Sequence, residues 1–234
     1  MEKGKMVYEG KAKRVYETAD PEIFIQEFKD DATAFDATKK GTIQQKGVVN
    51  NKISAILFKL LESKGIETHF VKQLDDRNML IKKVKIIPLE VTMRNIVAGG
   101  MSRLLGIKEG MVLEEPVLEY HYKDDSLHDP LINDYHARAL KLASDEELDF
   151  IKKRSFEINN ILKAFFDKRD LCLVDFKLEF GRSRDKILLA DEISPDTCRF
   201  WDKNTQEKLD KDRFRRDMGK VEEAYHEVLK RLTA

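Results

Sequence analysis

The chain has 234 residues, which is enough for one large domain or two closely associated lobes with a substantial core. Its 43 lysines and arginines balance its 43 aspartates and glutamates, so no net charge attracts it to nucleic acid or to an anionic membrane. No apolar run approaches the ~18 residues of a membrane helix, and the start MEKGKMVYEG lacks the apolar region of a signal peptide. Two cysteines, Cys172 and Cys198, are too few for a disulfide framework and favour a reducing cytoplasm.

The first half of the chain reads as strands interrupted by one helix. Residues 6–28 contain strand-like runs, with a turn at Gly10–Lys11. Apolar residues then recur with the 3.6-residue period from Val48 to Lys64, and Gly65 is expected to end this helix. More strand is expected from His69 to Val97.

The second half is expected to hold two long helices with a hairpin between them. Ser144 and Glu147 form the capping-box pattern that starts a helix. A second amphipathic helix is expected over 214–232, with Met218 among its buried residues. The hairpin strands are Leu173–Phe180 and Lys186–Ile193, joined by a five-residue turn. Strands and helices do not alternate regularly, so the sequence predicts an α+β fold rather than a doubly wound parallel sheet.

The segment LVDFKLEFG, residues 173–181, shows the clearest chemical pattern. Alternation along a strand puts its side chains on two faces, apolar on one side and charged on the other. The apolar face would hold Val174, Phe176, Leu178 and Phe180, and the charged face Asp175, Lys177 and Glu179. The alternative is a solvated strand face with a ladder of salt bridges.

The neighbouring strand could bring a second carboxylate to this charged face. If Phe180 pairs with Lys186, then Asp191 lies on the charged face and Leu189 lies opposite Lys177. Glu179 and Asp191 could then bind Mg²⁺, which takes few protein carboxylates and keeps water and phosphate oxygens as its other ligands.

Other segments carry cations suited to anionic ligands. Arg94 shares a strand face with Glu90 and leads into the small-residue turn 98–102, whose N–H groups could cradle a phosphate. Lys11 and Lys13 lie at the predicted hairpin. Each segment also has a plainer interpretation as an ordinary turn or an exposed basic turn.

Two polar segments near the C-terminus could also bind ligands. Asp196 and Arg199 follow the strand end, where a ligand could be held. Lys211 and Arg215 belong to a basic cluster at the start of the last helix, where positive charge opposes the helix dipole unless an anion or nearby aspartates compensate it.

Taken together, these segments resemble the phosphoribosylaminoimidazole-succinocarboxamide synthase (SAICAR synthetase) family. The resemblance runs the full length, from YEGKAKRVY through PLEVTMRNIVAGG, HDPLIN and LVDFKLEFG to DEISPDTCRFWD and DKDRFRRD. Two positions depart from the family pattern. Gly100 stands where the family usually has a phosphate-binding serine, so the Gly100 N–H or Ser102 would take that part, and Thr197 stands where glycine is common.

The resemblance implies a magnesium- and ATP-dependent ligase. It would condense L-aspartate with 5-amino-1-(5-phosphoribosyl)imidazole-4-carboxylate to give SAICAR, ADP and phosphate. The implied fold is two-lobed and related to ATP-grasp, with an antiparallel β lobe (1–85) covering ATP and an α+β lobe (86–234) holding the metal and ribonucleotide sites. A cytoplasmic homodimer is expected, without nucleic-acid or membrane partners.

The resemblance also implies roles for particular residues. The expected catalytic residues are Lys13, Lys123 and Lys177. Those expected to bind ATP are Lys11, Ala12, Lys13, Lys82, Val84, Ile86, Lys123, Lys177, Glu179, Leu189 and Asp191. Those expected to bind substrate are Glu90, Arg94, Gly100, Ser102, Asp175, Asp196, Arg199, Lys211 and Arg215. The expected metal ligands are Glu179, Asp191, Glu90 and Asp129.

Two other functions share parts of this pattern. A small-molecule kinase of the inositol-phosphate type would use the same phosphoryl-transfer groups but needs a hydroxyl acceptor. A non-catalytic nucleotide sensor would not need an acidic pair beside a second substrate site, so the grouping of Glu179, Asp191 and Lys177 disfavours it.

Overall fold

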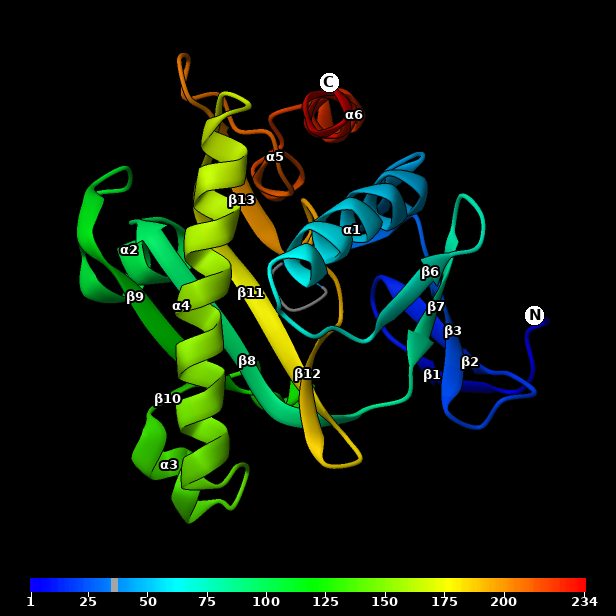
Figure 1. The fold of residues 1–234 in the computed structure, drawn as a ribbon. Helices are drawn as coiled ribbons and strands as arrows, with labels where there is room; N and C mark the ends of the chain where they lie inside the picture. The colour runs from blue at the N-terminus through cyan, green and yellow to red at the C-terminus, as the bar shows by residue number, and fades with distance from the viewer. Residues whose placement is uncertain (35–37) are drawn as a thin grey trace.

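The computed structural model describes residues 1–34 and 38–234, and it contains two antiparallel sheets that lie side by side (Figure 1). The first has the strand order β1 (Met6–Glu9), β2 (Lys13–Glu17), β3 (Ile23–Phe28), β7 (Asn78–Lys82), β6 (Phe70–Gln73). The second has the order β10 (Leu131–Ile132), β9 (Val112–Tyr122), β8 (Lys85–Ile96), β11 (Leu171–Ser183), β12 (Lys186–Ala190), with β13 (Cys198–Asp202) also paired to β11. A separate ribbon consists of β4 (Asp31–Ala34) and β5 (Lys39–Thr42).

Helices pack around these sheets. The longer ones are α1 (Lys46–Ser63), α4 (Asp145–Asp167) and α6 (Val221–Thr233), and the short ones are α2 (Gly99–Leu105), η1 (Asp125–Leu127), α3 (Asp134–Ala139) and α5 (Asp212–Arg215). Helix α4 lies across the six-stranded sheet, while α1 lies between the first sheet and α6 (Figure 1). None of the helices in the described part of the chain is both long and apolar enough to cross a bilayer.

The predicted helix boundaries have clear local causes. Helix α1 is followed by Gly65, whose φ of 83° is in the left-handed region that glycine adopts without strain. Helix α4 begins with the predicted capping box, in which the Ser144 side chain accepts from the Glu147 N–H and the Glu147 carboxylate accepts from the Ser144 N–H. The prediction of an α+β fold is confirmed.

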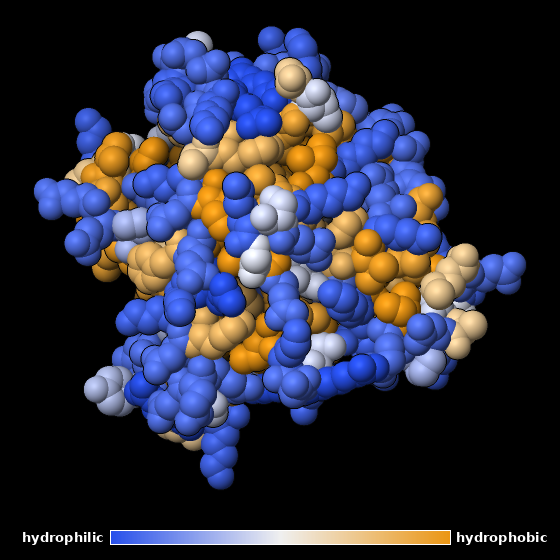
Figure 2. All heavy atoms as spheres, in the orientation of Figure 1, coloured by the Kyte–Doolittle hydropathy of each residue, from blue (hydrophilic) through white to orange (hydrophobic). Residues whose placement is uncertain are grey.

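One hydrophobic core extends across both sheets. Leu89, Val91 and Met93 of β8 belong to it, as their alternation with Glu90 and Arg94 predicted, and so do residues of the first sheet such as Phe28. Hydrophilic side chains cover much of the visible face, with apolar residues between them (Figure 2). Because the core is shared, the lobe boundary at residue 85 stays a prediction.

The pairing of β11 with β12 differs from the predicted register. Phe180 pairs with Leu189, not with Lys186, and the turn has two residues, Arg184 and Asp185. Gly181 therefore lies within strand β11 and not in the turn. A glycine is needed at this position, because a Cβ there would lie only 2.6 Å from the Val84 side chain. The three-residue shift reverses the faces of β12, so the prediction that Leu189 faces the ligand was wrong.

Strand β11 also contains an irregularity that simple alternation misses. Phe176, Leu178 and Phe180 lie in the main core as predicted, but Val174 packs with Ala98 and Trp201 in a second cluster. The cause is a register shift in the pairing with β13, between Leu173 and Asp175. The apolar side of the strand therefore changes at this point.

The predicted C-terminal helix is two helices. Helix α5 ends at Arg215, and α6 begins only at Val221. Asp217, Gly219 and Lys220 have positive φ values in the segment between them, which is incompatible with a continuous right-handed helix. Met218, predicted to be buried, is 44% exposed as a result.

Candidate active site

A polar cavity of about 630 Å³ opens where the two sheets meet. The sheets are joined there by a parallel bridge between Thr68 and Leu189, in which the His69 N–H donates to the Leu189 carbonyl over 2.8 Å. Many predicted site residues line the cavity: Lys11, Ala12, Lys13, Lys82, Val84, Ile86, Glu90, Lys123, Asp129, Lys177, Glu179, Asp191, Asp196, Lys211 and Arg215.

Two carboxylates predicted to act together line this cavity. Glu179 faces it from the centre of the six-stranded sheet, where it pairs in register with Glu90 of β8 and Ala190 of β12. Asp191 follows the end of β12 and has a φ of 64°. The left-handed backbone at Asp191, not strand alternation, therefore turns its side chain to the side of Glu179.

The two carboxylates have opposite pKa shifts. Burial and the Asp191 charge raise the pKa of Glu179 to about 7, although Lys123 opposes the shift. Burial also acts to raise the pKa of Asp191, but the charge and hydrogen bond of Lys13 outweigh it and lower the pKa. The neighbouring lysines therefore stabilise the charged form of Asp191 more than the charged form of Glu179.

Lysines from separate segments pair with these acids. The Lys13 ammonium contacts Asp191 and lies 3.0 Å from a Glu192 oxygen. Lys123 lies 2.5 Å from Glu179. Alternating acids and lysines thus surround the cavity, and the lysines could shift from carboxylates to the phosphates of a ligand.

Two of the four expected metal ligands have protein partners that hold them away from a shared metal site. Among the described residues no three His, Cys, Asp or Glu side chains are grouped to bind a metal ion. Glu90 instead pairs with Lys177 over 2.6 Å, and Asp129 accepts a hydrogen bond from the Asp124 N–H. Glu179 and Asp191 remain as two interacting carboxylates, each paired with a lysine that could yield to a cation. Such a pair fits Mg²⁺, which completes its shell with water and phosphate oxygens.

The connection between the two sheets, which carries three of the residues expected to bind ATP, forms another part of the cavity wall. Lys82, Val84 and Ile86 line this part, together with Phe24 and Ile81, which the sequence did not single out. The Lys82 ammonium donates to the Thr68 carbonyl over 3.0 Å, so it supports the wall of the cavity. Leu189 is 1% exposed and lies in the main core, not among the lining residues.

The arginines predicted to bind the ribonucleotide phosphate form a buried ion-pair network. Arg94 and Arg199 both pair with Asp175, at 2.7 and 2.9 Å. Their second partners are Glu119 and Asp212, at 2.7 and 3.0 Å. Because both oxygens of Asp175 are engaged by arginines, the structure does not support its expected direct contact with substrate.

The start of α2 lies against the same two arginines. Gly99 has a φ of 54°, and a Cβ there would lie 2.5 Å from a guanidinium nitrogen of Arg199. Gly100 lies near Arg94, at 3.6 Å by the same measure. Ser102 does not join them, because its hydroxyl donates to the Ile107 carbonyl beyond the other end of α2. Of the two substitutes for the family serine, the geometry therefore favours Gly100.

Several lining residues carried no recognisable sequence signal. His69 is 2% exposed, stacks edge-on against Phe58, and has its pKa lowered by burial to about 3, which makes it a neutral wall residue. The Gln26 amide donates to the Asp191 carbonyl over 3.3 Å. Both come from ordinary strand segments, so only the packing of the two sheets reveals them.

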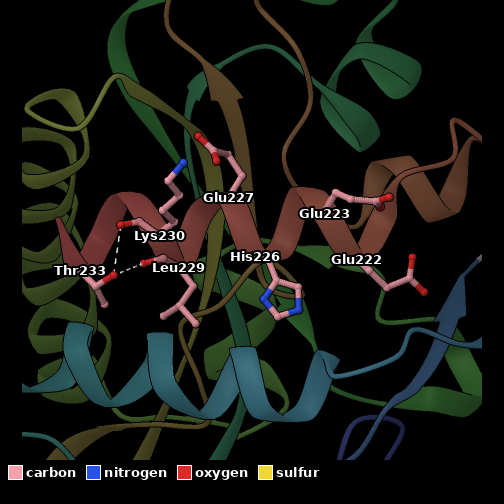
Figure 3. A pocket seen from close by; sticks show the side chains of 7 residues that line it. All are labelled: Glu222, Glu223, His226, Glu227, Leu229, Lys230 and Thr233. Carbon is pink, nitrogen blue, oxygen red and sulfur yellow. Dashed lines mark hydrogen bonds between the residues drawn. The ribbon is translucent and has the colours of Figure 1, made fainter.

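A second hollow, of about 790 Å³, lies along α6 and is lined by that helix alone (Figure 3). Its residues are Glu222, Glu223, His226, Glu227, Leu229, Lys230 and Thr233. His226 and Leu229 point toward α1, whereas Glu223, Glu227 and Lys230 point away from it (Figure 3). The polar groups do not converge, so this surface is not a candidate active site.

Comparisons with known proteins agree with the geometry. The SAICAR synthetase family model matches residues 6–232. A phosphoribosylaminoimidazole-succinocarboxamide synthase from Caldanaerobacter subterraneus subsp. tengcongensis is 62% identical, over 99% of both chains. The Ehrlichia chaffeensis synthase structure has a TM-score of 0.96 at 46% identity, covering 98% of this chain and 99% of that one. A SAICAR synthetase solved in complex with ADP has a TM-score of 0.95 at 49% identity, covering 98% and 97%.

These likenesses define an α+β enzyme, a ligase of purine biosynthesis. The chain belongs to the SAICAR synthetase family.

Proposed function

We propose that the enzyme joins L-aspartate to the carboxylate of 5-amino-1-(5-phosphoribosyl)imidazole-4-carboxylate, with conversion of ATP to ADP and phosphate. The observation that carries this proposal is the cavity between the sheets, where Glu179 and Asp191 lie among lysines from several segments. The ADP complex of a relative that is 49% identical supports a nucleotide in this cavity.

The nucleotide would lie with its base against the connection between the sheets and its phosphates beside the acidic pair. Val84 and Ile86 offer apolar contacts for adenine. Lys11 and Lys13 line the cavity from the hairpin between β1 and β2, where they can cover phosphates. The phosphate of the ribonucleotide would be held by Arg94, Arg199 and the Gly100 N–H.

The reaction needs activation because a carboxylate is a poor electrophile. An oxygen of the imidazole carboxylate attacks the γ-phosphorus of ATP, the bond to the bridging oxygen breaks, and ADP leaves. The aspartate amine then attacks the resulting acyl phosphate at carbon, loses a proton and expels phosphate. Lys123 and Lys177 would neutralise charge on the phosphoryl group during transfer, which depends mainly on positioning and electrostatics.

Glu179 and Asp191 would hold Mg²⁺ in this proposal. When bound, the ion neutralises phosphate charge and orients the transferring group. Lys13 and Lys123, now paired with the same two carboxylates, would be released by that neutralisation and become available to the nucleotide. The proposal also places the enzyme in the cytoplasm as a homodimer, without nucleic-acid or membrane partners.

A coupled assay of ADP release tests the reaction. With ATP, Mg²⁺ and the carboxylated ribonucleotide, we expect rapid ADP release only when aspartate is added, together with one SAICAR per ADP. A small-molecule kinase would instead release ADP without aspartate and leave a stable phosphorylated product. ADP release that is independent of aspartate would therefore overturn the assignment as a ligase.

A further inference from the structure

Asp196 lines the cavity, yet both of its carboxylate oxygens are already occupied by the protein. Oδ2 accepts from the Lys46 ammonium over 2.6 Å, and Oδ1 accepts from the Tyr225 hydroxyl over 2.7 Å. Lys46 is 0% exposed at the start of α1, and Tyr225 is 1% exposed in α6. Two helices that are far apart in the sequence therefore each donate a hydrogen bond to one carboxylate.

Lys211 differs from the other cations of the cavity. Lys11 pairs with Asp125, Lys13 with Asp191, Lys82 with a backbone carbonyl, Lys123 with Glu179, Lys177 with Glu90 and Arg215 with Asp212. The Lys211 ammonium has no hydrogen-bond or ion-pair partner anywhere in residues 1–34 and 38–234. Its backbone N–H is fixed by the Pro195 carbonyl over 3.2 Å.

An unpaired ammonium beside an aspartate is unusual, because such groups normally form an ion pair. Asp196 and Lys211 are close enough to interact electrostatically: burial and the charges of Arg215 and Lys46 lower the pKa of Lys211, while Asp196 opposes that shift. Each oxygen of Asp196 already has a protein donor within 2.7 Å, and these two donors compete with Lys211 for the carboxylate.

We infer that Lys46 and Tyr225 are positioning residues, which hold Asp196 so that the Lys211 ammonium stays available to a carboxylate or phosphate of a substrate. The inference rests on the proposed function. It also changes the expected part of Asp196, from a direct substrate ligand to a carboxylate that neutralises the cations around it. Aspartate and the imidazole ribonucleotide both carry suitable anions, so the test measures both.

The first test is Tyr225→Phe, which removes one oxygen and little volume. Oδ1 of Asp196 loses its donor, and the Lys211 ammonium, which already interacts electrostatically with Asp196, can take its place. We expect the KM of one acidic substrate to rise about tenfold, the effect of losing one charge-assisted hydrogen bond, while kcat changes little. The substrate whose KM rises, aspartate or the ribonucleotide, identifies the anion that Lys211 binds.

Tyr120→Phe is a matched control. Tyr120 is 3% exposed, and its buried hydroxyl has no hydrogen-bond partner within the described part of the chain. The same chemical change there should leave both KM values unchanged. Lys46→Met frees the other oxygen of Asp196 and repeats the test from α1.

The decisive comparison adds Lys211→Met. If Tyr225→Phe acts by diverting Lys211, the double variant should show the same KM as Lys211→Met alone. Additive KM effects, or a fall in Tm and kcat with unchanged KM values in both Tyr225→Phe and Lys46→Met, would overturn the inference. Failure of the proposed function is distinguishable, because the wild-type protein would then release no ADP in response to aspartate.

Discussion

Glu179→Gln and Asp191→Asn should each lower the steady-state rate about 10²–10³-fold, the usual effect of removing one group from a preorganised site. Each change removes one charge and keeps the shape of the side chain. Both carboxylates line the cavity where the two sheets meet, and neither substitution alters the other lining residues. We therefore expect a normal circular dichroism spectrum and a normal gel-filtration volume for both variants.

Asp125→Asn provides the control for these two substitutions. Asp125 lines the same cavity, but its side chain is 79% exposed and pairs with Lys11 at the mouth. Removal of the Asp125 charge should change the steady-state rate by no more than a few-fold, because an exposed ion pair contributes little free energy. Near-normal activity of both Glu179→Gln and Asp191→Asn would refute the proposed metal ligands.

Asp175→Asn should lower the free energy of unfolding by about 3 kcal/mol, as expected when one partner of a buried ion pair is removed. Asp175 is 3% exposed and lies between Arg94 and Arg199, which are themselves buried or nearly so. The asparagine would leave two guanidinium groups facing each other across a neutral amide. Urea unfolding, followed by tryptophan fluorescence, measures the change.

Asp217→Asn makes the same substitution in an exposed ion pair. Asp217 lies 2.6 Å from Lys39, and its side chain is 86% exposed. We expect no resolvable change in the unfolding midpoint. If Asp175→Asn were equally neutral, the buried network would not stabilise the fold, and a direct part for Asp175 in substrate binding would have to be considered again.

The order of strands and helices could be predicted because it depends on local patterns. The capping box at Ser144, Gly65 after α1, and the alternation of Leu89, Val91 and Met93 all act within a few residues. The charged face of β11 followed from the same alternation. Other lining residues, such as Lys82, Val84 and Lys123, were named only through the resemblance to the SAICAR synthetase family.

Register and pairing could not be predicted, because they depend on contacts between distant segments. Gly181 looked like part of a turn but lies within β11, where its missing side chain admits Val84. Leu189 was expected in the ligand site and lies in the core, since the true register reverses its strand. Glu179 and Asp191 nevertheless line one cavity, because the left-handed backbone at Asp191 turns its side chain there.

Ion-pair partners were also hidden from the sequence. Asp196 looked like a ligand group beside a strand end, but its two oxygens accept from Lys46 of α1 and Tyr225 of α6. Lys46 and Tyr225 showed no chemical motif of their own. Their part in the site is visible only in the structure, where the Lys46 ammonium and the Tyr225 hydroxyl both donate to the Asp196 carboxylate.

Binding of Mn²⁺, a paramagnetic substitute for Mg²⁺, in the presence of ADP tests the account most directly. Electron paramagnetic resonance of the wild-type protein should show a nucleotide-dependent bound ion. Glu179→Gln and Asp191→Asn should each weaken its affinity about tenfold or more. Wild-type affinity for Mn²⁺ in both variants would show that the ion is held elsewhere, and it would contradict the claim that these two carboxylates form the metal site.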